Sequence, residues 1–239
     1  MKITILFDNE VNSSLRGSGV KALWGFSAFI ETDSGNILFD TGSNGRILLH
    51  NARVLGIDLT AADWLFISHP HWDHIGGWDS VAEVNPHLKV IVPDSLSKHL
   101  TADMRKFFSS VQVSGSEPMR FATDFYSTGT MMPEGEQALI MRQPYGLVIV
   151  AGCSHPGIEN FMARAKEMFP SEQIYYVIGG FHLLRADRQT IEKSLQRFDT
   201  QYITPTHCTG NLATSMIKER FGLRQISGGV GQTVKLPFD

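Results

Sequence analysis

In the stretch Ser68-His69-Pro70-His71-Trp72-Asp73-His74-Ile75-Gly76-Gly77, three imidazoles and one carboxylate lie within six residues. Ligand-type side chains at this density predict a metal site. The apolar run before it, residues 64–67, is typical of a short buried strand, so the cluster lies where a strand leaves its sheet. The first two histidines point to the same side if the backbone stays extended. The aspartate and the third histidine then turn in from the following loop, and the two glycines allow close backbone approach.

The composition indicates a globular protein and does not favour nucleic acid as a partner. Of the 239 residues, 42% are hydrophobic, the net charge is −3, and lysine and arginine are dispersed. A charge follows the first few apolar residues, and no stretch approaches the roughly 18 apolar residues of a membrane span. We therefore expect a cytoplasmic protein without a membrane segment. Its oligomeric state is left open.

The pattern along the chain is hairpins followed by β-α-β-α units, twice over. The predicted strands are 2–7, 24–30, 36–40, 64–67, 88–92, 138–142, 146–151, 174–178, 201–205 and 232–236. The predicted helices begin near residues 41, 96, 158, 188 and 211 and end near residues 55, 108, 169, 198 and 220. Residues 109–136 lack a period and are expected to be irregular. We expect one domain, 1–239, with two similar αβ halves, roughly 1–115 and 125–239, whose sheets face each other with helices outside.

Ligand-type residues recur where the predicted strands end. Five apolar runs end in Asp40, His69, His155, His182 and His207. Strand ends are where open αβ sheets assemble sites from separate parts of the chain. We therefore expect these residues to contribute to one site.

Imidazole and carboxylate together suit zinc, iron or manganese. The expected ligands are His69, His71 and His155 for one ion and Asp73, His74 and His207 for a second. Two such ions share a hydroxide and polarise the scissile group. This is the chemistry of ester, phosphoester or amide hydrolysis, and it needs no serine or cysteine nucleophile.

The two cysteines lie beside expected ligands, since Cys153 precedes His155 and Cys208 follows His207. Reduced thiols are expected rather than a disulfide. Two interpretations are open: small buried apolar side chains at strand ends, or thiols that support the ligands or face the substrate.

The stretch Ser68–Gly77 resembles the metal-binding motif of the metallo-β-lactamase superfamily, and His155 and His207 match its later metal motifs. Residues 38–42 resemble the family's early motif, whose aspartate, here Asp40, supports the site without binding the metal. The resemblance covers essentially the whole chain. It implies an α/β fold, a four-layer αββα sandwich, with two divalent ions, zinc ahead of iron or manganese, and a hydrolase that uses a metal-bound hydroxide.

Residues 152–155, 179–183 and 207–210 resemble one branch of that superfamily, which includes the archaeal dihydropterin ribofuranosylaminobenzene phosphate synthase. That enzyme acts in the synthesis of a methanopterin-type cofactor. The resemblance therefore implies one alternative to a hydrolase, a synthase-like transferase that binds a phosphorylated sugar. A non-catalytic sensor that keeps the metal site is a second alternative.

One position departs from the commoner family pattern. Many members have a metal-bridging aspartate at the strand end where this chain has His182. His182 is therefore expected either as an additional ligand or as a general acid or oxyanion donor. Loss of the carboxylate makes the two-metal site more positive by one charge, so we expect an anionic small-molecule substrate such as a phosphate ester. Asp73 and His182 are the expected catalytic residues.

Overall fold

The computed structural model describes residues 1–238, which form two compact units. The first holds residues 1–115 and 228–238, and the second is Ser116–Ser227. The sequence places the closing strand in the second half, but the structure pairs it with the first strand of the chain. The end of the chain thus belongs to the first unit, and the description of the whole as one domain stays a prediction.

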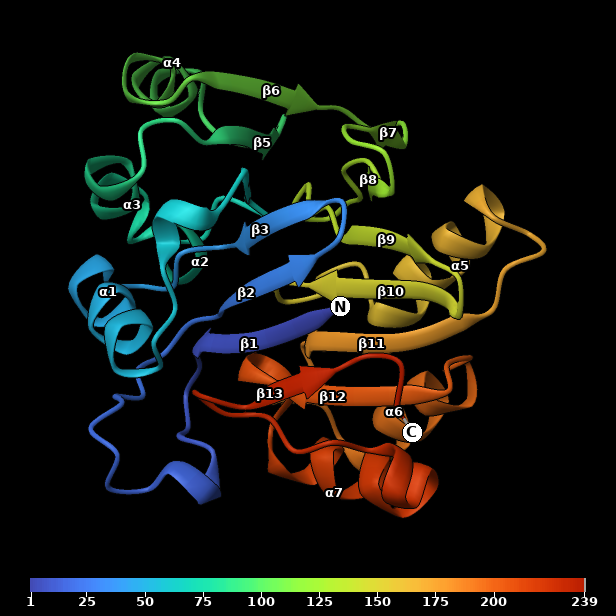
Figure 1. Cartoon of the computed structure of the whole chain (residues 1–239). Coiled ribbons are helices and arrows are strands. Elements are labelled where there is room, and N and C mark those ends of the chain that lie inside the picture. The colour runs from blue at the N-terminus through green and yellow to red at the C-terminus, as the bar shows by residue number, and fades with distance from the viewer. Residues whose placement is uncertain (239) are drawn as a thin grey trace. The chain divides into compact units, whose positions relative to one another are not determined.

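The first unit is built on a seven-stranded mixed sheet in the order β13-β1-β2-β3-β4-β5-β6 (Figure 1). Its strands are β1 Lys2–Phe7, β2 Ser27–Thr32, β3 Gly35–Phe39, β4 Trp64–Phe66, β5 Lys89–Pro93, β6 Ser110–Ser114 and β13 Thr233–Lys235. Strands β3 to β6 run parallel, whereas β13, β1, β2 and β3 pair antiparallel. The ends of β3 and β4 therefore lie at the same edge of the sheet.

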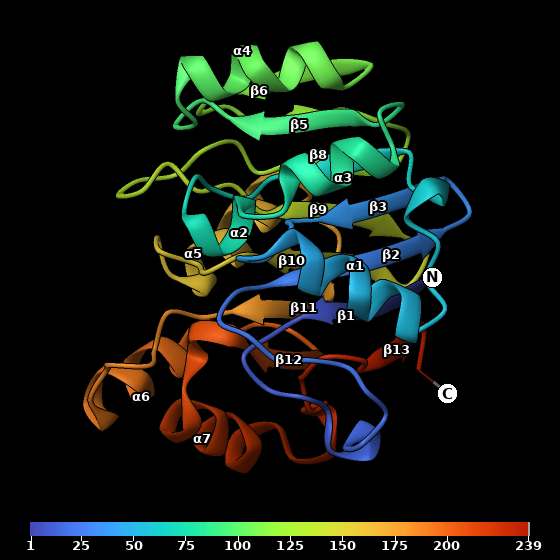
Figure 2. The same cartoon turned by 90° about the vertical axis from the view of Figure 1, so that its left-hand side faces the viewer.

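Helices cover one face of this sheet, as Figure 2 shows for α1 and α3. The helices are α1 Gly45–Val54, α2 Trp72–Ile75, α3 Trp78–Val84 and α4 Lys98–Phe107, with 3₁₀ turns η1 Ser13–Leu15 and η2 Leu59–Ala61. Helix α1 begins at Asn44, whose side chain accepts a hydrogen bond from the Ile47 amide. Its apolar stripe, Leu48 and Ala52, packs against Leu38 and Leu65 of the sheet. This buried face anchors the strand ends that carry the site.

The second unit is built on a six-stranded sheet in the order β12-β11-β10-β9-β8-β7. Its strands are β7 Met119–Arg120, β8 Phe125–Ser127, β9 Leu139–Gln143, β10 Gly146–Ala151, β11 Ile174–Gly180 and β12 Tyr202–Thr206. Strands β10, β11 and β12 are parallel, and β10 pairs antiparallel with β9. Three neighbouring strands thus end at one edge.

The helices of this unit are α5 Ile158–Met168, α6 Arg188–Gln196 and α7 Asn211–Phe221, with 3₁₀ turns η3 His207–Thr209 and η4 Gly222–Arg224. Their apolar sides pack on Ile149, Val177 and Ile203, which are neighbours across β10, β11 and β12. The fully buried strands explain why these segments read as continuous apolar runs rather than as alternating ones.

The structure differs from the predicted elements in several places. Helix α3 was not predicted, and the short strands β7 and β8 lie within residues 109–136. Residues 110–114 form the edge strand β6, inside the segment expected to be irregular. Most of its side chains are exposed, so the strand lacks the apolar content that marks a buried one. Asp73 and His74, expected in a loop, lie in the short helix α2.

No helix within residues 1–238 is long and apolar enough to cross a membrane.

Candidate metal centre

The histidine cluster of the first unit begins directly after β4. His69 and His74 are fully buried, and Asp73 is 6% exposed. The ring of His69 lies 4.5 Å from that of His71 and 4.2 Å from that of His74, measured between centroids. Asp73 Oδ2 lies 3.9 Å from His74 Nε2. The first unit thus brings its four expected ligands together.

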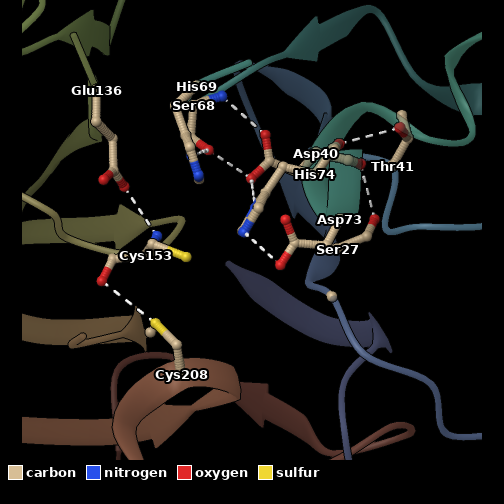
Figure 3. Close-up of polar contacts among 12 residues, drawn as sticks. Ser27, Asp40, Thr41, Ser68, His69, Asp73, His74, Glu136, Cys153 and Cys208 are labelled. Carbon is tan, nitrogen blue, oxygen red and sulfur yellow. Dashed lines mark hydrogen bonds and ion pairs between the residues drawn. The ribbon is translucent and has the colours of Figure 1, made fainter. Parts of the chain in front are cut away.

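Asp40, at the end of β3, fixes the orientation of His74 (Figure 3). Its Oδ2 accepts a hydrogen bond from His74 Nδ1 at 2.7 Å, because a carboxylate offers only acceptors. The Nε2 atom of His74 then carries the lone pair. Asp40 therefore lies where the sequence expects a residue that supports a ligand histidine.

Ser68 fixes the tautomer of His69 in the same way. Ser68 Oγ donates its one proton to Asp40 Oδ2 at 2.6 Å, and the Ser68 amide donates to Asp40 Oδ1 at 2.7 Å. Because that proton is used, the contact of 2.9 Å between Ser68 Oγ and His69 Nδ1 has the histidine as donor. The lone pair of His69 is therefore on Nε2.

Close backbone packing holds this arrangement. Thr41 Oγ1 donates to the His74 carbonyl at 3.0 Å (Figure 3). It also accepts from the Gly77 amide at 3.1 Å. A Cβ on Gly77 would lie 2.7 Å from the Thr41 carbonyl oxygen, and one on Gly76 would lie 2.5 Å from that of Ser43. The close approach expected at the two glycines is confirmed.

In the second unit the expected residues follow three neighbouring parallel strands. His155 follows β10, His182 follows β11, and His207 follows β12 in η3. The centroids of the His155 and His182 rings are 4.5 Å apart. Ser154, His182 and His207 have positive φ of 61°, 52° and 47°, and Asp40 in the first unit has 50°. These left-handed residues form abrupt turns at the strand ends.

Glu136 supports the second unit's site, and the sequence does not reveal it. The side chain is fully buried. Its Oε1 accepts from the amides of Cys153 and Ser154 at 2.8 and 2.9 Å. Its Oε2 accepts from the amide and from Nδ1 of His155 at 2.8 and 2.7 Å. No motif separates it from the exposed Glu134, two residues earlier.

His182 and the two cysteines are neighbours in this unit. A ligand-type atom of each, from Cys153, His182 and Cys208, lies within 4.8 Å of the other two. A hydrogen bond with Cys208 raises the pKa of His182, against the effect of burial. Burial acts to raise the pKa of the Cys208 thiol, but hydrogen bonds with Cys153 and His182 hold it well below its ordinary value.

A cavity of about 350 Å³ adjoins His155 and His182. Lys193, in α6, and Arg197, the C-cap residue of α6, also line this cavity. Arg197 is held in place by Asn160, to whose Oδ1 its Nη2 donates at 2.6 Å. The cavity therefore combines imidazole groups with two cations.

The donor types in each unit fit a divalent metal ion. In the first unit His69 and His74 donate from Nδ1 to an oxygen of Ser68 or Asp40, and in the second unit His155 donates to Glu136, which leaves an Nε2 lone pair on each ring. A histidine held in this way by an oxygen acceptor is the usual arrangement of metal-binding imidazole. Imidazole with carboxylate suits zinc, iron or manganese.

The sequence matches the family model of the metallo-beta-lactamase superfamily over residues 24–212. A curated relative, 7,8-dihydropterin-6-methyl-4-(beta-D-ribofuranosyl)-aminobenzene-5'-phosphate synthase of Methanocaldococcus jannaschii, is 28% identical over 249 residues, covering 82% of this chain and 84% of the relative.

Two solved structures are similar over nearly the whole chain. A metal-dependent hydrolase of the beta-lactamase superfamily has 27% identity and a TM-score of 0.80, with 99% of each chain covered. The metallo-beta-lactamase fold protein YhfI from Bacillus subtilis has 13% identity and a TM-score of 0.68, with 98% of this chain and 99% of that chain covered. These matches confirm the resemblance and the α/β fold of the metallo-β-lactamase type.

Proposed function

Because this chain belongs to the metallo-β-lactamase superfamily, we propose that it is a metal-dependent hydrolase of a small anionic molecule, most simply a phosphate ester. In the first unit the proposed ligands are His69, His71, Asp73 and His74. In the second they are His155 and His207, with His182 as an additional ligand or a proton donor. Two ions are proposed, zinc ahead of iron or manganese.

The proposed metal ions would lower the pKa of a water molecule and polarise the scissile group. Two carboxylates of the protein already hold ligand histidines in the orientation that metal binding needs. Asp40 and Glu136 orient His74 and His155, so that neither ring must reorganise when it binds an ion. His182, exposed and near His155, is placed to give a proton or a hydrogen bond to the leaving group. Asp73 is the proposed carboxylate partner of the reacting water.

The cavity beside His155 and His182 is the observation that supports an anionic substrate. Lys193 and Arg197 face it, and two cations near a site of imidazole donors favour a negatively charged group. Glu159 also lines the cavity, but its carboxylate accepts from Ser194 at 3.0 Å and pairs with Arg197 at 3.4 Å. Because Arg197 is paired with Glu159, we propose that Lys193 is the cation that binds the substrate.

The test is an assay of the metal-loaded protein on bis-p-nitrophenyl phosphate, lactones and nitrocefin. We expect turnover of the phosphate ester and loss of turnover in His69→Ala. Inhibition should be stronger by phosphorylated than by neutral analogues. Equal inhibition by both would contradict the anionic substrate. A metal-loaded protein inert to all three substrates would contradict the hydrolase and favour a sensor.

A synthase-like transferase is the second candidate, and the 28% identity to the methanogen synthase favours it. In that case the same residues would hold a phosphorylated sugar for bond formation rather than hydrolysis. Calorimetric binding of a pterin and of ribose 5-phosphate to the metal-loaded protein separates the two. Binding of both, with no turnover of simple phosphate esters, would favour the transferase.

A further inference from the structure

Two thiols and an imidazole meet at the ends of β10, β11 and β12. Cys153 follows β10, His182 follows β11, and Cys208 lies in η3 directly after β12. The register aligns Ala151 with Gly179 and Gly180 with Thr206, so the three strands end side by side. The ligand-type atoms of the three residues lie within 4.8 Å of one another. This spacing brings three donors around one point.

The backbone at Gly180 leaves room for the Cys208 thiol. A Cβ on Gly180 would lie 2.6 Å from Cys208 Sγ and 2.6 Å from the Gly152 carbonyl oxygen, so only glycine leaves room there. Cys208 Sγ donates to the Cys153 carbonyl at 3.4 Å, and Figure 3 shows its sulfur turned toward Cys153. The thiol is thus directed at its partner and away from the apolar core.

Burial and access also suit a ligand site. Cys153 and Cys208 are 4% and 5% exposed, whereas His182 is exposed at the cavity. Both cysteines are reduced in the structure.

We propose that Cys153, His182 and Cys208 form a thiolate site for a borderline or soft divalent cation such as Zn²⁺. Two sulfurs and one imidazole match the donor set of a zinc site that keeps a fourth position for water or substrate. The ion replaces the two thiol protons, which are released to solvent on binding. None of these donors is a carboxylate, so the site prefers zinc, cadmium or cobalt to magnesium or manganese.

The first test is titration of the metal-free full chain with Co²⁺. Thiolate ligation gives an intense near-ultraviolet charge-transfer band, which binding to imidazole and carboxylate alone does not give. We expect this band in the wild type, a weaker band in Cys153→Ser and in Cys208→Ser, and no band in the double variant. His182→Ala should shift the visible cobalt bands, whereas His99→Ala, on the exposed side of α4, should not.

X-ray absorption of the zinc-loaded wild type gives a measurement that needs no variant. We expect zinc–sulfur scattering at about 2.3 Å, with two sulfurs per ion at this site. Cobalt binding without the charge-transfer band, or a zinc spectrum without sulfur, would overturn the proposal. Loss of both free thiols in the denatured, aerobically isolated protein would also overturn it, in favour of a disulfide.

Metal binding at Cys153, His182 and Cys208 does not require that the protein is a hydrolase. The cobalt and X-ray spectra report sulfur ligation in a protein that turns over no substrate. A catalytically inert protein with the band would contradict the proposed function and leave this site standing.

Discussion

The carboxylate of Glu136 lies 2.7 Å from Nδ1 of His155, the same distance that separates Asp40 from Nδ1 of His74. Both acids are fully buried, and both also accept backbone amides. A buried carboxylate thus orients one proposed ligand histidine in each unit. Only Asp40 was marked by a sequence motif.

Glu136→Gln should lower both stability and metal affinity. The amide nitrogen of glutamine would face backbone donors that now bond to a carboxylate oxygen, so we expect the free energy of unfolding to fall by about 1–3 kcal/mol. Denaturant unfolding of the metal-free protein measures this. Glu117→Gln, on an exposed residue, is the matched control and should leave the midpoint unchanged. Equal midpoints for the two variants would contradict the role of Glu136.

Asp40→Asn should weaken metal binding while the fold is retained. Asparagine keeps the size of the side chain but removes the charge that holds His74 and Ser68. Loss of such a supporting acceptor reduces metal affinity by about 10–100-fold. Competition with a chromophoric chelator gives the affinity. Asp33→Asn, on the exposed β2–β3 turn, should bind metal as the wild type does, and the same affinity for both variants would count against the assignment.

Removal of metal should lower the melting temperature. An ion at 1,000 times its dissociation constant stabilises the native state by about 4 kcal/mol. For a chain of this size that corresponds to about 10 °C, which differential scanning calorimetry with and without chelator resolves. His69→Ala should show a smaller difference in melting temperature between the two conditions. His50→Ala, on the surface of α1, should show the same difference as the wild type. A wild type that melts at one temperature in both conditions would refute the metal site.

Lys193→Gln should affect anionic substrates selectively. Removal of one cation from the cavity wall should raise KM for a phosphate ester about fivefold, less at high salt, and leave a neutral substrate unaffected. Lys218→Gln, on the exposed side of α7, provides the comparison. The anionic assignment fails if both substrates respond equally to Lys193→Gln.

Gly180→Ala should disturb the strand end around Cys208. The new methyl group would meet the Gly152 carbonyl oxygen, which cannot move freely, at 2.6 Å. Overpacking of this kind costs about 1–3 kcal/mol. Gly115→Ala is the control, because a Cβ there meets only Asp94 at 3.8 Å. Thermal unfolding compares the two variants. A Gly180→Ala protein as stable as Gly115→Ala would contradict the prediction, because it would show that the strand end can move to accept the methyl group.

Much of the architecture was predictable because its cause is local. Strand β1 occupies residues 2–7 as predicted, and the helices near residues 158 and 211 begin where predicted. Burial on both faces produces an apolar run that the sequence displays directly. The relationship between Asp40 and His74, 34 residues apart, could also be predicted, because β3 and β4 are neighbouring parallel strands and His74 lies in the segment that follows β4.

The remaining features depend on contacts that leave no local pattern. Glu136 is separated from His155 by 19 residues and precedes a strand without any motif of its own. The edge strand β6 buries little: in Ser110–Ser114 only Val111 and Val113 are apolar, and Val113 is exposed, so the segment shows no continuous apolar run. Ser68 was part of the quoted motif, but its role in fixing the tautomer of His69 follows only from its two simultaneous contacts.

The left-handed residues at the strand ends have a consequence for protein engineering. Asp40, Ser154, His182 and His207 each occupy a backbone region that costs an ordinary L-residue about 1–2 kcal/mol, whereas glycine adopts it readily. Glycine at Asp40 would remove the acceptor of the buried donors of Ser68 and His74, which costs at least as much as the backbone term. His182 is different, because its side chain is exposed, so a selection for thermal stability of the metal-free protein would favour glycine there. Such a selection would retain the two sheets and remove a side chain proposed to act in the site, so a thermostable variant of this chain should be checked for His182 first.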